Sequence, residues 1–288
     1  MHIKRSLIYS LLPLCFFLLT LQLTSAGEDK VVADFHLFKV GKIKVLALRD
    51  ASNEMKAELI VNGDPDVVKK YMPDGKLPAS INAFIIKTES KTILVDAGLG
   101  EDGKRKGVLL KSMKRAGIKP EDIDMVLLTH THFDHIGGLV HNGKAVFTNA
   151  KVFLSENENK SLSPVAKKIL KVYERKISTI KEEQYVFKGI KAVELAGHTP
   201  GHTGFLVESE GKELLIFGDL IHITSLQFPH PEFSLKYDSD VRRAVKIRKE
   251  ILEMAAKEKL TVAGAHIIFP GIGRVEKQDK GYRFIPDK

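Results

Sequence analysis

Residues 127–138 read Leu127-Leu128-Thr129-His130-Thr131-His132-Phe133-Asp134-His135-Ile136-Gly137-Gly138. The apolar residues that lead up to His130 predict a buried strand, which runs straight into four potential metal ligands. In an extended segment His130 and His132 project to the same side, so their imidazoles can reach one ion. After the next turn, Asp134 and His135 can face a second ion close by. A lone histidine is more often an ordinary core or surface residue, but four such groups at one strand end predict a metal site.

Three further segments supply the ligands that one motif cannot. His198 lies in a loop punctuated by Gly and Pro, and Asp219 and His266 each end a predicted strand. Strand ends are places where a rigid scaffold positions reactive side chains. Nitrogen and carboxylate donors without sulfur suit zinc, with manganese, iron or cobalt as alternatives. Two neighbouring cations repel one another unless anions lie between them, so a carboxylate from Asp219 and a hydroxide are expected to bridge them.

The remaining sequence predicts strands and helices without repeats or long linkers. Runs rich in β-branched and apolar residues predict strands at Ile43–Leu48, Ile81–Lys87, Thr92–Val95, Ile123–Thr129, Ala145–Phe147, Val152–Leu154, Ile190–Leu195, Gly204–Val207, Glu213–Phe217 and Leu260–Ala265. Helical patterns are found at Val108–Arg115, from Ser163-Pro164 along Val165, Ile169, Val172, Tyr173 and Ile177, and from about Asp240 to Lys257. Hairpin-like strand pairs mixed with isolated helices indicate two sheets with helices outside them.

The ligand motif, followed in order by His198, Asp219 and His266, resembles the metallo-beta-lactamase superfamily. The resemblance covers roughly residues 43–288. It implies an α/β fold, a four-layer αββα sandwich of two mixed β-sheets with the metals at one edge. By the family pattern, one zinc is held by His130, His132 and His198, and the other by Asp134, His135 and His266, with Asp219 bridging them. Asp96, which follows the predicted strand Thr92–Val95, matches the superfamily's aspartate that orders the ligand loop from behind.

Several other segments resemble the methyl parathion hydrolase branch and its lactonase relatives. They are Gly218-Asp219-Leu220-Ile221-His222 with Gln227-Phe228-Pro229, Gly264-Ala265-His266 with Phe269-Pro270-Gly271-Ile272-Gly273, and Gly281-Tyr282-Arg283. True beta-lactamases generally lack the aspartate found at Asp219. The resemblance implies a metal-dependent hydrolase of neutral esters, either lactones or aryl esters, with organophosphate triesters in specialised members. The short stretch between His135 and His198 and the absence of tryptophan argue against the organophosphate specialisation.

Roles follow from the same resemblance. A water shared by the two zincs becomes a hydroxide nucleophile, and Asp134 is expected to carry its proton to the leaving group. His222 stands where related lactonases carry a tyrosine that touches the substrate, although a merely structural role is the alternative. Pocket walls, or equally core residues, are expected at Phe133, Leu226, Phe228 and Phe269. Four other histidines are expected to be surface or hydrogen-bonding residues, namely His36, His141, His202 and His230.

The N-terminus has the three parts of a secretory signal. Lys4 and Arg5 precede an apolar run from Leu7 to Leu23, and Thr24-Ser25-Ala26 offers a cleavage site. We therefore expect a signal peptide at residues 1–26, an exported (periplasmic or secreted) protein, and one hydrolase domain at residues 27–288. An uncleaved membrane anchor is the alternative. Cys15, the single cysteine, lies inside the leader, so disulfides and thiolate ligands are excluded from the mature protein.

The formal net charge is +9, and the excess is concentrated where basic residues alternate with Glu on helical patterns. This arrangement favours a solvated face over a nucleic-acid surface. The expected partner is therefore a small neutral ester. A homodimer is possible as well. Other hydrolytic reactions of the superfamily are the alternatives: thioester cleavage of the glyoxalase II kind, phosphodiester cleavage or beta-lactam cleavage. A protein that holds metals without catalysis is a third hypothesis.

Overall fold

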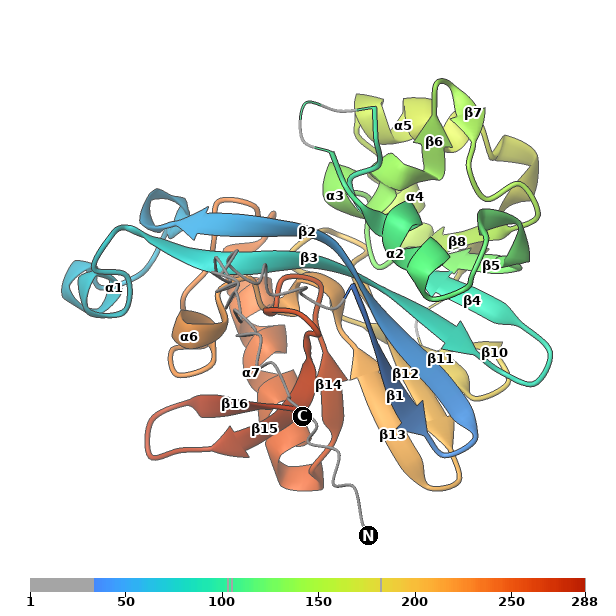
Figure 1. Ribbon diagram of the computed structural model, residues 1–288. Coiled ribbons are helices and arrows are strands. Elements are labelled where there is room, and N and C mark those ends of the chain that lie inside the picture. Colours follow the sequence, from blue (N-terminus) through green and yellow to red (C-terminus); the bar gives the residue numbers. More distant parts are fainter. Residues whose placement is uncertain (1–33, 103, 105, 182, 288) are drawn as a thin grey trace, which may run out of the picture. The chain divides into compact units, whose positions relative to one another are not determined.

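Two mixed β-sheets of seven strands each pack face to face through an apolar core (Figure 1). The structure, a computed structural model, describes residues 34–102, 104, 106–181 and 183–287, and the signal peptide predicted at residues 1–26 lies outside them. In the order in which they pair, the strands of the first sheet are β1 (Phe35–Val40), β2 (Ile43–Lys56), β3 (Lys76–Lys87), β4 (Thr92–Val95), β5 (Met125–Leu127), β8 (Lys151–Ser155) and β9 (Ile177–Ile180). Pairs from β4 to β9 are parallel, and those from β1 to β4 are antiparallel.

The second sheet is antiparallel except for one parallel pair, β13 with β14. Its strands are β10 (Tyr185–Phe187), β11 (Ile190–Glu194), β12 (Thr203–Ser209), β13 (Lys212–Ile216), β14 (Thr261–Ala263), β15 (Ile272–Lys277) and β16 (Tyr282–Pro286). A separate two-stranded ribbon joins β6 (Val140–His141) and β7 (Lys144–Ala145). The helices are α1 (Pro65–Tyr71), α2 (Leu109–Arg115), α3 (Phe133–Ile136), α4 (Glu156–Lys160), α5 (Pro164–Lys171), α6 (Thr224–Gln227) and α7 (Val241–Glu258).

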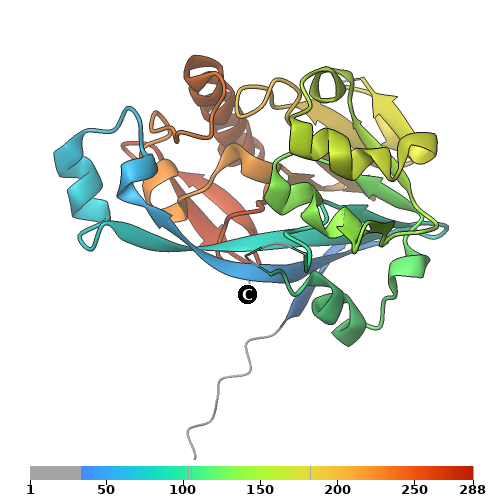
Figure 2. The ribbon, with the colours of Figure 1, turned by 90° about the horizontal axis from the view of Figure 1, so that it is seen from above.

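The strand sequences explain the layering. In β2, Val45 and Ala47 point into the core between the sheets, whereas Leu46 and Leu48 point to the opposite face of their sheet. That opposite face is covered by α2 and α5, and the outer face of the second sheet is covered by α7. Because the strand is buried on both faces, it reads as a continuous apolar run. Figure 2 shows α2 and α7 on opposite sides of the two sheets, and the predicted four-layer αββα sandwich is confirmed.

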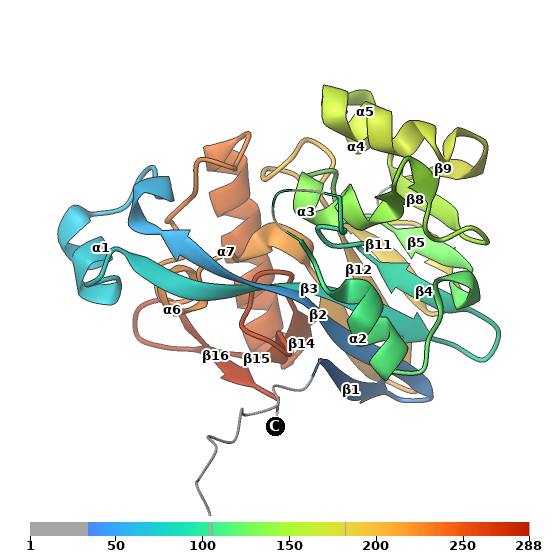
Figure 3. The same ribbon diagram turned by 45° about the horizontal axis from the view of Figure 1, so that its top comes forward.

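The strands that the sequence analysis missed are mostly edge strands. β1 and β9 border the first sheet, β10 and β16 border the second, and β15 lies next to β16. Edge strands bury less side-chain surface and carry more charged residues, so their alternation of apolar and polar residues is weak. The hairpin of β2 and β3 is also longer than predicted. It extends beyond the sandwich to α1 (Figure 3), where Met55 and Met72 pack against Leu226 and Phe233.

Helices α2 and α7 are confirmed close to their predicted bounds. The helix predicted to extend to Ile177 is wrong, because α5 ends at Lys171 and Ile177 begins β9. Val165 and Val172 are exposed, but Ile169 and Tyr173 of the predicted face do pack against the core, together with Ala166 and Leu170. Within the described part of the chain, no helix combines the length and apolar character needed to cross a bilayer.

Candidate metal centre

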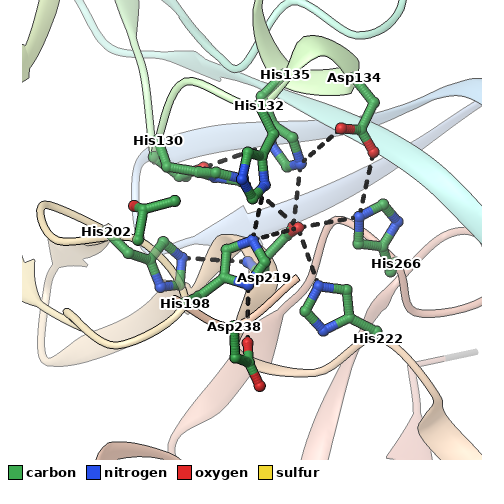
Figure 4. A network of polar contacts seen from close by, with 12 residues as sticks. His130, His132, Asp134, His135, His198, His202, Asp219, His222, Asp238 and His266 are labelled. Atoms are coloured by element: carbon green, nitrogen blue, oxygen red, sulfur yellow. Dashed lines mark hydrogen bonds and ion pairs between the residues drawn. The ribbon is translucent and has the colours of Figure 1, made fainter. Parts of the chain in front are cut away.

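All seven predicted ligands gather at one edge of the two sheets (Figure 4). Most of them follow the carboxyl end of a strand: His130 follows β5, His198 follows β11, Asp219 follows β13 and His266 follows β14. Their ligand atoms form two groups, each with all members within 4.8 Å of one another: His130, His132, His198 and Asp219, and Asp134, His135 and His266. A third such group joins Asp219 and His266 to His222. The first two groups follow the division expected from the family pattern.

Asp219 lies at the centre of the cluster, as Figure 4 shows. Its Oδ2 atom is 3.3 Å from Nε2 of His198 and 3.1 Å from Nε2 of His266. Its Oδ1 atom is 3.1 Å from Nε2 of His135. One carboxylate therefore reaches histidines of both groups, which is the geometry that a bridging ligand requires.

Hydrogen bonds at Nδ1, on the side of the ring away from the centre of the cluster, fix the orientation of three of the imidazoles. The Nδ1–H group of His135 donates to Asp96 over 2.8 Å, and that of His266 donates to the carbonyl oxygen of Ser80 over 2.9 Å. The Nδ1–H group of His198 donates to Asp238 over 2.9 Å. Each bond sets the tautomer and leaves Nε2 free to face the centre of the cluster.

Asp96 connects the ligand motif to the neighbouring strand. Its carboxylate accepts hydrogen bonds from the backbone N–H and the hydroxyl of Thr129, each over 2.8 Å, besides the bond from His135. The side chain is nearly completely buried. The structure therefore places Asp96 where it orders the segment that carries the first ligands.

Asp238 was not found by sequence reasoning. It precedes α7, whose N-cap is Asp240, and nothing in the local pattern separates an aspartate that supports a ligand from one that caps a helix. Burial raises the pKa of Asp238, but the hydrogen bond from His198 and the charge of Arg248 outweigh this effect and hold it well below 3.8. Asp238 is therefore an anion that fixes His198.

The carboxylates of the cluster stabilise positive charge close to them. Burial raises the pKa of Asp219, but the charges of His135 and His266 outweigh it and hold that pKa well below 3.8. Burial lowers the pKa of His266, yet Asp219 and Asp134 outweigh it and raise it to about 8. In His132 burial outweighs the charges of Asp219 and Asp134, and it lowers the pKa to about 4. Without an ion, Asp219 is therefore ionised and His132 is neutral near pH 7, whereas His266 keeps a proton that a dication would displace on binding.

Unsatisfied polar atoms test whether these residues fit a metal. Among the described residues, several buried atoms of the cluster have no hydrogen-bond partner: Nε2 of His130, Nε2 of His135, Oδ1 of Asp219 and both ring nitrogens of His222. Buried nitrogen and oxygen atoms are rarely left unpaired, because the loss of their hydration is costly. Their convergence around one carboxylate fits divalent metal ions with nitrogen and oxygen ligands.

Two further histidines lie beside the cluster. His202, which was expected to be a hydrogen-bonding residue, donates from Nδ1 to the carbonyl oxygen of Leu195 and accepts from the backbone N–H of Asp219. Burial lowers its pKa to about 3, so it is neutral. His222 is buried, stacks on His266 with ring centroids 5.2 Å apart, and places Nε2 3.2 Å from Asp219 Oδ2.

A cavity of about 490 Å³ opens beside the cluster. Its lining combines ligand residues with other side chains: Asn53, Met55, Ile81, Leu99, Lys104, His132, Phe133, Asp134, His198, Asp219, His222, Tyr237 and His266. Of the predicted walls, Phe133 lines it. Leu226 and Phe228 do not, because both are buried in hydrophobic clusters, and Phe269 packs against the core between the sheets. For these three residues the wall prediction is wrong.

A model of the metallo-beta-lactamase superfamily matches residues 77–266, more than half of the chain. The chain belongs to the metallo-beta-lactamase superfamily. It is 27% identical over 239 residues to an N-acyl homoserine lactonase of Bacillus cereus, a match that covers 75% of this chain and 89% of that protein.

Solved structures of the superfamily are also similar. Hydrolase AbOPH has a TM-score of 0.85 and 31% identity, over 90% of this chain and 99% of that one. AidC, a dizinc quorum-quenching lactonase in complex with a product, has a TM-score of 0.83 and 29% identity, over 88% of this chain and 97% of that one. With its fold, its relatives and its His/Asp cluster, the chain is a metal-dependent hydrolase of the metallo-beta-lactamase superfamily.

Proposed function

We propose that this chain hydrolyses small neutral lactones at a centre of two zinc ions. The observation that carries the proposal is the cavity of about 490 Å³ that joins the Asp219-centred cluster to an apolar wall. The similarity to N-acyl homoserine lactonases and to the dizinc lactonase AidC supports both the substrate class and the metal.

The ligand geometry supports one ion in each group. His130, His132 and His198 would hold the first zinc, Asp134, His135 and His266 the second, and Asp219 would contact both. Bound there, the ions would supply an ionised water as nucleophile and a Lewis acid for the carbonyl oxygen of the ester. The protein holds the ligands ready through Asp96, Asp238 and the backbone of Ser80.

Two side chains of the cavity are proposed to act on the substrate. Asp134 is 3.4 Å from His266 and lines the cavity, with 28% of its side chain exposed. It can accept the proton that the attacking water loses and deliver it to the alkoxide that leaves when the ring opens. His222 lines the same cavity next to Asp219, where its imidazole can donate a hydrogen bond to the oxygen that gains charge.

The cavity walls support an uncharged substrate. Met55, Ile81, Leu99 and Phe133 provide apolar surface that fits the hydrocarbon part of a lactone or an aryl ester. Among the described residues that line the cavity, Lys104 is the single lysine or arginine. A phosphodiester substrate would need more basic residues than this, because its charge must be held beside the metals. Lactones therefore remain the preferred class, with aryl esters second.

A substrate panel tests the proposal. Zinc-loaded protein is assayed with an N-acyl homoserine lactone, an aryl ester, S-lactoylglutathione and a bis-aryl phosphodiester. We expect ring opening of the lactone to have the highest kcat/KM, weaker aryl esterase activity, and loss of both rates when a chelator removes zinc. Activity on the phosphodiester alone would overturn the proposal, and a rate that survives complete metal removal would refute the mechanism.

We also propose that residues 1–26 are a cleaved signal peptide and that the hydrolase works outside the cytoplasm. The order of basic, apolar and small residues in the leader supports this. Mass spectrometry of protein purified from an exporting host is expected to show a chain that starts at Gly27. A mature protein that retains its leader would support the membrane anchor instead.

A further inference from the structure

Ligands of the proposed first zinc come from two loops that belong to different sheets. His130 and His132 follow β5 of the first sheet, whereas His198 lies in the loop between β11 and β12 of the second sheet. We call residues 129–132 the motif loop and residues 195–202 the His198 loop. Nε2 of His198 and Nδ1 of His132 are 3.0 Å apart, so the spacing of the two loops sets the spacing of these two ligand atoms.

A single carboxylate bridges the two loops. Oε1 of Glu158 accepts hydrogen bonds from the backbone N–H of Thr131 over 2.8 Å and from its hydroxyl over 2.6 Å. Oε2 accepts from the hydroxyl of Thr199 over 2.7 Å and from the backbone N–H of Gly201 over 3.2 Å. Each oxygen therefore serves one loop, and each loop contributes one backbone donor and one hydroxyl.

The Glu158 site is closed to solvent. Its side chain is nearly completely buried, and Thr131 and Thr199 are buried as well. Among the described residues no cation pairs with this carboxylate, so its charge is compensated by the four donors. Burying a carboxylate without a cation costs free energy unless hydrogen-bond donors occupy its oxygens. Packing alone therefore does not explain a glutamate at this position.

The backbone of α4 is docked on the His198 loop at the same point. The hydroxyl of Ser155 donates to the carbonyl oxygen of Gly201 over 2.8 Å and accepts from the backbone N–H of Glu158 over 3.1 Å. A Cβ atom on Gly201 would lie 2.0 Å from that nitrogen, so only glycine permits the contact. One backbone bond, from the N–H of Thr203 at the start of β12 to the Thr129 carbonyl, also joins the motif loop to the strand that follows the His198 loop. Glu158 contributes four of its own.

We propose that Glu158 is a positioning residue that sets the distance between His132 and His198 and thereby the affinity for the zinc ion they share. This inference rests on the proposed dizinc centre. Glu158 touches neither ion nor substrate in this scheme, and it acts through the backbone on either side of the ligands. None of the proposed ligands of the second zinc belongs to the His198 loop, so that ion is expected to depend on Glu158 far less.

The test is Glu158→Gln, which preserves the shape but replaces one acceptor with an amide donor that faces donors. We expect the affinity for one of the two zinc ions to fall about 10–100-fold, the range found when groups that support metal ligands are removed. The affinity for the other zinc is expected to stay close to the wild-type value. Competition with a chromophoric chelator measures both constants, and cobalt substitution should alter the visible spectrum of one site only.

Matched variants separate positioning from stability. Glu156→Gln lies on the same helix, is half-buried, and should leave both affinities and the cobalt spectrum unchanged. Thr199→Val removes one of the four bonds and should give a smaller shift at the same zinc site, whereas Thr199→Ser, which keeps the hydroxyl, should restore it. These threonine variants retain the buried carboxylate, so they decide the matter even if Glu158→Gln does not fold.

Two outcomes would overturn the proposal. One is wild-type affinity for both zinc ions in folded Glu158→Gln, with a lower melting temperature as its only change. The other is an equal loss at both sites. Because these measurements concern metal binding, they do not depend on the substrate: a wild-type protein that fails to open lactones would contradict the proposed function and leave this inference intact.

Discussion

Nδ1 of His198 lies 2.9 Å from Oδ1 of Asp238, so the imidazole donates its proton to a buried carboxylate and keeps Nε2 for a metal. Asp238→Asn removes the charge at nearly constant shape. We expect the affinity for the ion held by His198 to fall about 10–100-fold, because the carboxylate makes the imidazole a stronger ligand. Metal titration and kcat/KM measure the effect. Asp240→Asn is the control, since asparagine also caps α7, and equal affinities in the two variants would contradict the role.

Arg248 supports the same pair from inside the protein. The guanidinium is 1% exposed, donates to the carbonyl oxygens of Leu220, Pro231 and Phe233, and lies 3.4 Å from Asp238. Arg248→Met leaves the buried Asp238 anion without its cation and removes the guanidinium donor from the carbonyls of Leu220 and Pro231. We expect a loss of about 3–5 kcal/mol in the free energy of unfolding.

Urea denaturation measures this loss, and Arg242→Met, at an exposed position of the same helix, should change stability by less than about 0.5 kcal/mol. A double-mutant cycle with Asp238→Asn completes the test. The double variant should lose less than the sum of the single losses, because the unpaired anion is then absent. Additive losses would show that the ion pair carries no coupling.

Arg248 also shows how far the sequence could be interpreted. The helix from Asp240 to Lys257 was predicted correctly, and its buried residues Ala244, Ile251 and Leu252 mark the apolar stripe. Arg248 lies on that stripe, four residues after Ala244, where helical periodicity points a side chain toward the core. The basic composition of the helix had instead indicated a solvated face. An arginine at a core-facing position of a helix therefore indicates a buried, paired cation, even where the overall composition of the helix is basic.

The clustering of the seven proposed ligands could be predicted because most of them are ligand-type residues that follow strand ends, and strand ends can be located from local patterns. Glu158 and Asp238 could not, because their roles depend on contacts with residues 27 to 43 positions away. The wall residues failed for a related reason. From the sequence alone, an apolar residue near a ligand, such as Leu226, cannot be assigned to a cavity wall or to the core.

Asp219→Ala is expected to lower metal content and activity together. The carboxylate reaches His135 on one side and His198 on the other, so its removal would leave the two proposed cations without this shared anion. The rate should fall by at least about 100-fold, since a direct ligand contributes more than the groups that support it. Elemental analysis beside the lactonase assay measures both quantities. Full occupancy with a normal rate would count against the bridging role.

His222→Asn is expected to separate metal binding from catalysis. If the imidazole donates to the substrate oxygen, kcat should fall about 10²–10³-fold, as when an oxyanion donor is removed. Zinc content should stay at the wild-type value, because the six histidine and aspartate ligands around Asp219 remain. A parallel loss of zinc would instead make His222 a ligand, in line with its position 3.2 Å from Asp219.

Asp50 gives a prediction for pH. Its buried carboxylate accepts backbone N–H groups from Leu99 and Leu109, but burial outweighs these bonds and raises its pKa above 3.8. A raised pKa means that the folded state binds the proton more tightly than the unfolded state. This contribution to stability is therefore full below the unfolded pKa of about 3.9 and is lost as the pH rises through the folded value.

Asp50→Asn abolishes this titration but leaves an amide donor facing a backbone donor, a fixed cost of about 1–3 kcal/mol. Wild type should therefore exceed the variant in stability most clearly near pH 4, and the difference should shrink toward neutral pH. Urea unfolding of metal-free protein at several pH values measures it, with Asp279→Asn as an exposed control. A difference that grows with pH would mean that the Asp50 anion stabilises the fold, because the hydrogen bonds to Leu99 and Leu109 would then outweigh burial.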